Sequence, residues 1–405
     1  MRVHDAVVIG AGPAGLSAAA ALSREWDCLL LEQGKRHTAR HRSAPDELLA
    51  GVGGAGLFSD GKHSFYPAAS ELWTLPEPHL LAAAYADMAA LLERHGVVAG
   101  PWQGCTPGAA PTGVWHIKRY PSVYMPLARR MDAIAELEGA CPSRWTGARV
   151  LAARRAGRRI ALEVARDGST GWVHTRALVV ATGRLSPRWV RPWLTTLGAR
   201  FEFRRLEFGV RVESGASSPL FTQLRGVDPK LRFVDADEHG ELRTFCCCRE
   251  GEVVCGEADG ITAYSGRADG PPTGRSNLGL LVRTRDAEVA REVEAVMFAA
   301  RPIRRVLATI DGAGLQPVFG ERGAALMVRG LARLREWCPG LRDDSDAWVY
   351  APCIEGVGDY PVDDGALRVA PGVWVAGDVC GRFRGIVASM VSGRYVALQL
   401  LRGRA

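Results

Sequence analysis

The sequence predicts an α/β fold in two domains, and three observations carry the prediction. Residues 4–9 are a short apolar run, followed by a glycine-rich turn and an alanine- and leucine-rich helical segment. Residues 149–180 hold β-like segments separated by glycine turns. Residues 372–378 form another apolar run, and a helical segment then reaches about residue 401. Strands that alternate with helices favour a parallel sheet covered by helices.

Composition places the chain among ordinary globular proteins that are large enough for two hydrophobic cores. It has 405 residues, of which 47% are hydrophobic and 23% charged. The formal charge of +7 comes mainly from arginines that are scattered along the chain. Because nucleic-acid binding needs a basic stripe or a dedicated module, we expect no nucleic-acid partner. A compositional drift towards arginine explains the charge, and an anionic substrate or partner is the alternative.

The apolar segments and the cysteines bear on the compartment of the protein. No run of about eighteen apolar residues occurs, so no membrane span is predicted. Residues 7–22 are apolar enough to resemble the core of a secretory signal peptide. However, they carry the glycines of the glycine-rich turn, so we expect no targeting segment there. Ten cysteines without the spacing of a small disulfide-rich domain favour reduced thiols and a cytoplasmic location.

The glycine-rich turn after residue 9 predicts a dinucleotide site. The residues that we expect at the pyrophosphate are Gly10, Gly12, Pro13, Ala14 and Gly15. Glycines in this pattern give a tight turn, close approach of the backbone to phosphate, and close packing of helix on strand. The helix N-terminus adds free N–H groups and a partial positive charge. Glu32 ends the next apolar strand and is expected to accept hydrogen bonds from the ribose hydroxyls.

Two later segments are expected to complete this site. Gln33 and Arg36 lie in a basic turn that we place beside the adenosine part of the ligand. Residues 51–62 contain too many glycines for a regular helix or strand, which favours a loop whose N–H groups approach a flat ligand. A mobile surface loop is the alternative. The residues of this loop that we assign to the cofactor are Gly54, Ala55, Ser59 and Asp60.

The β-like segments in the middle of the chain indicate the class of cofactor. From Val150 onward, they resemble the small three-stranded layer that is inserted in FAD-binding folds, and we assign Val150 to the cofactor site. Their last strand ends in Ala181, Thr182 and Gly183, where a strand-end glycine lets the chain pass close to the cofactor.

The carboxyl-terminal unit supplies the second half of the cofactor prediction. Its strand ends in Gly377 and Asp378, and its helix begins near Gly385 and Ile386. The acid can hydrogen-bond the ribityl side of a flavin. The helix N-terminus can stabilise negative charge on the flavin pyrimidine. Because a nicotinamide dehydrogenase has no need of this unit, and because the chain carries a single phosphate-binding fingerprint, the sequence favours noncovalently bound FAD over NAD.

Five stretches of the chain resemble one known family. They are residues 53–62, 181–186, 208–213, 245–248 and 377–386. The family consists of FAD-dependent dehydrogenases, often described only as FAD/NAD-utilising oxidoreductases, within the glutathione-reductase-like flavoprotein superfamily. The chain departs from the family pattern where Asp378 replaces a glutamate and Arg384 replaces a glycine. The resemblance implies an FAD site in a Rossmann-type domain, but the substrate pocket is expected to be this chain's own.

Two cysteines in the resemblance, Cys246 and Cys248, allow several interpretations. Side chains two apart on a regular strand are poorly placed for a disulfide, and a zinc site would need two further ligands. Packing beside the flavin is the first interpretation. Lining of the substrate pocket is the second, and a redox pair or metal site is the third.

The candidates for proton transfer and catalysis are His63, Lys62 and Glu355. A histidine beside the flavin loop can take a substrate proton as hydride leaves, and an exposed loop position is the alternative. Lys62 can stabilise the flavin anion, and Glu355 precedes the terminal strand closely enough to face the cavity. Asp60 and Tyr264 are further candidates.

These observations predict an FAD-dependent oxidoreductase, a dehydrogenase or reductase that transfers two electrons between flavin N5 and a small organic substrate. An oxidase or monooxygenase is the alternative, followed by a non-catalytic FAD-binding protein. The Rossmann-type FAD domain, with a three-layer parallel sheet and a β-meander, is expected at residues 1–66, 127–200 and 365–405. A cap segment is expected at 67–126 and a mixed α+β substrate domain at 201–364. NAD(P)H is a candidate transient electron donor, and the chain is expected to be a monomer or homodimer.

Overall fold

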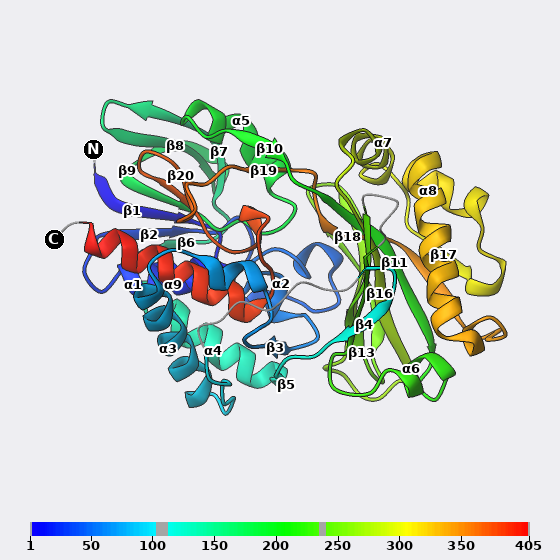
Figure 1. Cartoon of the computed structure of the whole chain (residues 1–405). Coiled ribbons are helices and arrows are strands. Elements are labelled where there is room, and N and C mark those ends of the chain that lie inside the picture. Colours follow the sequence, from blue (N-terminus) through cyan, green and yellow to red (C-terminus); the bar gives the residue numbers. More distant parts are fainter. Residues whose placement is uncertain (1, 103–111, 235–239, 404–405) are drawn as a thin grey trace.

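The computed structural model describes residues 2–102, 112–234 and 240–403, and these residues form two large sheets. A sheet of eight strands lies in one half of the molecule, and a sheet of seven strands lies in the other (Figure 1). The first strand and the last helix both belong to the half with the eight-stranded sheet (Figure 1). The chain therefore leaves this half and returns to it at its carboxyl end.

The eight-stranded sheet is built around five parallel strands, in the order β21-β9-β1-β2-β6. β20 pairs antiparallel with β21, and β7, β8 and β9 form an antiparallel meander. The strands are β1 (Val3–Ile9), β2 (Cys28–Leu31), β6 (Arg144–Trp145), β7 (Arg149–Ala156), β8 (Arg159–Arg166), β9 (Ser169–Val180), β20 (Arg368–Ala370) and β21 (Val373–Val375). The predicted parallel sheet and the predicted meander are both present.

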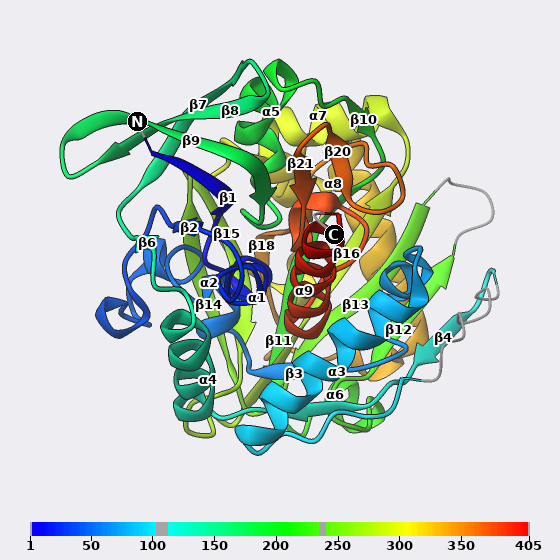
Figure 2. The same cartoon turned by 90° about the vertical axis from the view of Figure 1, so that its left-hand side faces the viewer.

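Two helices that begin beside the carboxyl ends of these strands pack against each other. They are α1 (Pro13–Leu22) and α9 (Ile386–Arg402), and Figure 2 shows them side by side over the sheet. The helices lie so close that a Cβ on Gly393 would stand 2.0 Å from the carbonyl oxygen of Ala14. This contact fixes the amino-terminal turn relative to the carboxyl-terminal helix.

The seven-stranded sheet is antiparallel, in the order β17-β18-β11-β16-β13-β12-β4. Its strands are β4 (Trp115–Lys118), β11 (Leu206–Gly215), β12 (Lys230–Val234), β13 (Gly240–Cys248), β16 (Arg275–Thr284), β17 (Ile303–Val306) and β18 (Trp348–Gly356). Two helices cover one face, namely α7 (Ala287–Met297) and α8 (Gly312–Trp337) (Figure 1).

The alternation of side chains along β11 explains why this sheet has one apolar face and one charged face. Leu206, Phe208 and Val210 belong to the second hydrophobic core, whose members also come from α7 and α8. Glu207 and Arg211, which alternate with the apolar residues of this strand, line a cavity. Because successive side chains of a strand point to opposite faces, the apolar set packs on the helices and the charged set faces the other half of the molecule.

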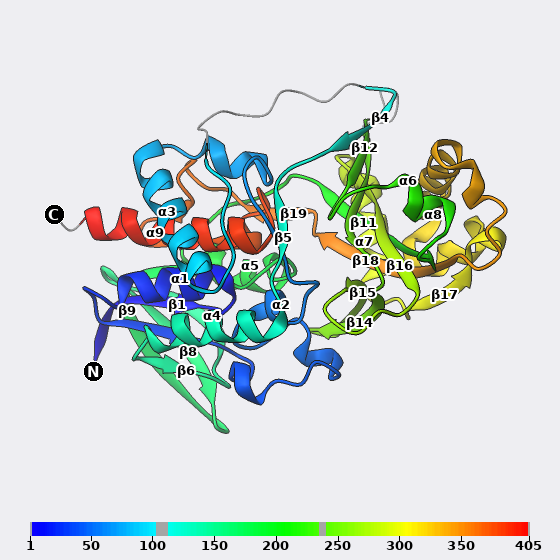
Figure 3. The same cartoon turned by 90° about the horizontal axis from the view of Figure 1, so that it is seen from below.

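Smaller elements connect the two halves. The hairpin of β14 (Glu252–Ala258) and β15 (Ile261–Arg267) lies where the halves meet (Figure 3), with Gly256 against Leu49. The remaining helices are α2 (Gly54–Leu57), α3 (Pro78–Arg94), α4 (Leu127–Gly139), α5 (Pro187–Thr196) and α6 (Pro219–Gln223). The remaining strands are β3 (Lys62–Ser64), β5 (Ser122–Tyr124), β10 (Phe201–Phe203) and β19 (Asp359–Pro361). No helix in the described ranges is long and apolar enough to cross a bilayer.

The expected cap segment, residues 67–126, is divided between the two halves. Helix α3 packs against α9, and its buried side chains belong to the core of the first half. Strand β4, which lies within the expected cap segment, forms an edge of the seven-stranded sheet. Residues 103–111 lie outside the described residues. The prolines and glycines near β4 are not typical of a strand, and its partner β12 is more than a hundred residues away in the sequence, so the local pattern does not predict this pairing.

Candidate functional site

A cavity of about 890 Å³ lies between the two halves of the molecule. One wall comes from the carboxyl ends of β1, β9 and β21, and the other from the charged face of the seven-stranded sheet. Open α/β sheets bind their ligands at the carboxyl ends of the strands. The sequence-assigned cofactor residues that line this cavity are Gly10, Gly12, Pro13, Ala14, Glu32, Gln33, Gly54, Ala55, Ser59, Asp60, Val150, Ala181, Thr182, Gly183, Gly377, Asp378, Gly385 and Ile386.

Gly15 is assigned to the cofactor from the sequence, but the structure gives it a different position. A Cβ on Gly15 would stand 1.7 Å from the carbonyl oxygen of Gly10, so the residue lies where helix α1 crosses strand β1. It is absent from the lining of the cavity, whereas Gly12, Pro13 and Ala14 are part of it. Gly15 therefore holds the turn closed, and its neighbours present the backbone to the cavity.

Glu32 directly follows β2 at the cavity and connects the loops around it. Its carboxylate accepts hydrogen bonds from the backbone N–H groups of Ala11 (2.7 Å), Gly34 (2.8 Å) and Gly51 (3.1 Å). The side chain thus ties the first glycine-rich turn to the second glycine-rich loop. It also remains in the lining of the cavity.

Arg36 does not face the cavity, contrary to the sequence-based expectation. Its Nε donates to Glu138 Oε1 at 3.0 Å, and Glu138 also lies 2.5 Å from the Nδ1 atom of His37. A buried carboxylate on α4 therefore binds the side chain of Arg36 away from the cavity. The carboxylate comes from a distant part of the sequence, so the local pattern gave no sign of it.

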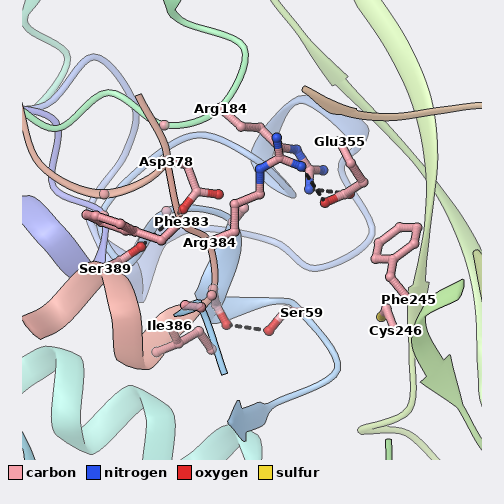
Figure 4. Close-up of a pocket in the computed structure, with 18 of the residues that line it drawn as sticks. Ser59, Arg184, Phe245, Cys246, Glu355, Asp378, Phe383, Arg384, Ile386 and Ser389 are labelled. Atoms are coloured by element: carbon pink, nitrogen blue, oxygen red, sulfur yellow. Dashed lines mark hydrogen bonds and ion pairs between the residues drawn. The ribbon is translucent and has the colours of Figure 1, made fainter. Parts of the chain in front are cut away.

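The second glycine-rich loop contributes polar groups to the cavity. Ser59 Oγ donates to the carbonyl oxygen of Gly56 at 2.8 Å (Figure 4). The ammonium of Lys62 lies 2.9 Å from Asp60 Oδ2 and 2.9 Å from Asp228 Oδ1. Burial alone would lower the pKa of Lys62, but the charge of Asp60 and its other acidic neighbours raises that pKa well above its ordinary value. Lys62 is therefore a fixed positive charge.

His63 does not face the main cavity, which corrects its assignment as a flavin-side base. On β3 it points to the face opposite Lys62, as alternation along a strand requires. Its ring is buried beside Met125 and Arg130, and its Nδ1 lies 3.1 Å from the carbonyl oxygen of Gly61. Burial lowers the pKa of His63 to about 4, so the ring is neutral at neutral pH.

Asp378 and Glu355 meet two arginines in the cavity, as Figure 4 shows. Asp378 accepts a hydrogen bond from Ser389 Oγ at 3.2 Å, and burial raises the pKa of Asp378. Glu355 Oε1 accepts from Arg184 at 2.5 Å, and Glu355 Oε2 lies 3.6 Å from Arg384. Arg384, the residue that departs from the family pattern, thus stands at the centre of these groups.

Glu207 is a site residue that the sequence analysis missed. Its carboxylate lies 2.8 Å from Arg205, 3.1 Å from Arg283, 3.3 Å from Arg384 and 3.7 Å from Arg243. Burial would raise the pKa of Glu207, but these arginines hold that pKa well below its usual range. A charged residue between the apolar Leu206 and Phe208 is the signal that could have identified it.

Cys246 and Cys248 are closer than a regular strand allows. Cys246 has a φ of +45°, and the register of β13 with β16 shifts between Phe245 and Cys248. This irregularity brings the two sulfur atoms to 3.5 Å, and both cysteines are free thiols. Cys246 also lies 3.1 Å from Asp60 Oδ2 and lines the cavity.

The same cluster fits a metal ion poorly. Asp60, Cys246 and Cys248 place one ligand atom each within 4.8 Å of one another. However, the Lys62 ammonium is paired with Asp60, and Arg211 Nη2 lies 3.5 Å from Cys248 Sγ. Two buried cations beside three ligand atoms oppose the entry of a further cation.

Comparison with known proteins gives one family match and several structural likenesses. Residues 8–74 match the family of NAD(P)-binding Rossmann-like domains. No curated protein matches the chain. A geranylgeranyl bacteriochlorophyll reductase-like protein from Thermoplasma acidophilum is 14% identical, with a TM-score of 0.49, and the match covers 100% of this chain and 79% of that one.

Two further solved structures are similar at the same level. The flavin-dependent brominase Bmp2, as a triple mutant, is 12% identical with a TM-score of 0.47 over 99% of this chain and 80% of that one. AlpK is 16% identical with a TM-score of 0.44 over 98% of this chain, which spans 61% of the AlpK chain. The matched segment and the sheet topology show a Rossmann-like domain with a parallel sheet, joined to a second, sheet-rich domain.

Proposed function

We propose that the protein is an FAD-dependent oxidoreductase that holds FAD noncovalently in the cavity between its two halves. The observation that carries this proposal is the convergence of two strand–helix units on one cavity. The turn before α1 and the turn before α9 both line it, although they are more than 350 residues apart. A nicotinamide nucleotide alone would need only the first of these units.

The chain's own residues fit such a cofactor. Within the described residues, neither α1 nor α9 has a side-chain hydrogen bond at its N-cap, so their first N–H groups remain available. The first helix N-terminus suits a pyrophosphate, and the second suits the part of a flavin that becomes negative on reduction. Glu32 and Asp378 lie at the corresponding ends of the cavity wall, where they can accept hydrogen bonds from the hydroxyls of the cofactor.

Bound flavin would supply two-electron chemistry, and the surrounding side chains would supply charge and orientation. Lys62 stays positive between Asp60 and Asp228 and holds these two carboxylates in place. Asp378 is buried with a raised pKa, which makes it the cavity acid best suited to hold a proton. Glu355 is fixed by Arg184 and orients groups that enter between them. We therefore place a dehydrogenase or reductase step, with a small organic substrate, on this wall.

Anaerobic reduction distinguishes this activity from its rivals. Purified, FAD-loaded protein is mixed with NADH and with NADPH without oxygen, then with candidate organic acids and alcohols, while flavin absorbance is followed. We expect an organic substrate or a nicotinamide nucleotide to bleach the flavin. Rapid reoxidation by oxygen with hydroxylated product would instead identify a monooxygenase. A bound flavin that no donor reduces, even with light and a sacrificial donor, would contradict an enzymatic role.

A further inference from the structure

One wall of the cavity carries an unusual concentration of positive charge. Lys118 on β4, Arg232 on β12, Arg243 on β13 and Arg283 on β16 all line it, and we call these four residues the cationic face. The strand register brings them together, because Arg232 pairs with Arg243 and Glu241 pairs with Arg283. Residues far apart in sequence thus form one continuous patch inside the molecule.

The acidic residues nearby are too few to balance the cationic face. Glu241 Oε2 accepts from Arg232 at 2.6 Å and lies 3.2 Å from Arg283. Glu207 lies 3.1 Å from Arg283 but is also paired with Arg205 and Arg384. Two carboxylates, one of them shared with two other arginines, therefore face four cations.

Several donors on the cationic face are unused. The Nε atom of Arg243 is buried and has no hydrogen-bond partner, and the same guanidinium approaches Glu207 only to 3.7 Å. The ammonium of Lys118 has no ion-pair partner within the part of the chain that the structure describes. Burial and then the charge of Arg232 lower the pKa of Lys118. Burial and then the charge of Arg243 lower the pKa of Arg283 to about 10.

Such an arrangement is unfavourable unless an anion enters the cavity. Like charges in a partly buried site repel one another, and solvent screens them less than it does at an open surface. A solvated basic surface would explain the residues if they pointed outward, but they line the cavity that the phosphate-binding turn also lines. A cavity of about 890 Å³ is of the size that binds small molecules.

We infer that the cationic face binds a carboxylate or phosphate group of the molecule that exchanges electrons in this cavity. The assignment of that molecule as the electron donor or acceptor rests on the proposed function, whereas anion binding itself does not. The forked donors of Arg243 and Arg283 suit the paired oxygens of either group. Phe245 follows Arg243 on the same side of β13 and lies across the cavity from Asp378 and Ser389 (Figure 4), so it can contact the rest of the molecule.

Calorimetric titration of the FAD-loaded protein tests this inference. The probes are succinate, its neutral analogue succinamide, inorganic phosphate and NADPH, at constant ionic strength. We expect at least one anionic probe to bind and succinamide not to bind. The variant Arg243→Gln should weaken anion binding about tenfold or more, because the pair of charge-assisted hydrogen bonds from one guanidinium group is lost. Arg159→Gln, on an exposed hairpin, is the matched control and should leave it unchanged.

The probes distinguish an organic acid from a nucleotide phosphate as the source of the anion. The experiment also distinguishes this inference from the proposed FAD-dependent function. Binding of succinate assigns the face to an organic acid, and binding of NADPH alone assigns it to a nucleotide phosphate. Arg243→Lys, which keeps the charge, should retain part of the affinity and guards against loss through misfolding. The inference is overturned if none of the anions binds to the wild-type protein. It is also overturned if the variants Arg243→Gln and Arg283→Gln bind the anion as tightly as the wild-type protein does. A protein that binds the anion but not FAD would refute the proposed function alone.

Discussion

At the scale of single residues, neighbours from distant strands decide what each side chain can do. Lys62 and His63 are adjacent in sequence, yet one is a charged member of the cavity wall and the other is a neutral ring behind it. The composition of the loop indicates polar groups near a ligand, but it does not indicate which face of β3 lines the cavity. The cationic face was missed for the same reason, because its members come from four strands that the sequence does not place side by side.

The buried state of His63 gives a prediction about pH. Its pKa is about 4 in the folded protein against an ordinary value of 6.5, so the unfolded chain binds a proton that the folded chain does not. Stability therefore falls as pH drops from 6.5 towards 4, and by pH of about 5 the loss from this residue is about 2 kcal/mol. Urea unfolding at a series of pH values should show a shallower fall for His63→Gln.

The control for this measurement is the exposed histidine His79. His79→Gln should follow the wild-type pH dependence, because its ring is largely in solvent. Equal slopes for wild type and His63→Gln below pH of about 6.5 would contradict the burial of His63 as the cause.

At the scale of elements, local sequence patterns predict strands and helices well where the chain pairs with near neighbours. The apolar runs of β1 and β2, the meander and the final strand–helix unit follow from residue spacing alone. Strands β4 and β5 do not follow from residue spacing, because the sequence around them is rich in proline and glycine. The bulge at Cys246 is likewise absent from the sequence pattern, since it depends on the pairing of β13 with β16.

The contact between α1 and α9 can be tested with one methyl group. Gly393→Ala would place a Cβ 2.0 Å from the carbonyl oxygen of Ala14, so one helix must move. We expect a loss of about 1–3 kcal/mol in unfolding free energy and weaker FAD binding, because both helix N-termini border the cavity. The measurements are urea unfolding and FAD titration. Gly139→Ala, with open space at its Cβ, is the control and should change neither.

An unchanged FAD affinity in a destabilised Gly393→Ala protein would separate the two effects. It would mean that the helix contact supports the fold without positioning the cofactor turns. If the contact does position both turns, stability and FAD affinity must fall together.

At the scale of the whole molecule, the cavity exists because two cores are joined through it. One core collects the amino- and carboxyl-terminal segments, and the other collects the antiparallel sheet with α7 and α8. The first supplies glycine turns and helix N-termini, and the second supplies charged strand faces. The sequence predicts the half with the glycine turns because its motifs are local. The other half depends on the register of seven strands, which residue spacing alone does not reveal.

The most direct test of the proposed cofactor is the identity and amount of flavin released from the purified protein. The protein is denatured, the supernatant is separated by chromatography, and the flavin is quantified against the chain. Noncovalent FAD, about one molecule per chain after reconstitution, is the predicted result. Release of FMN, flavin that stays attached to the denatured chain, or a protein that neither retains nor takes up FAD would contradict the assignment of the cavity as a noncovalent FAD site.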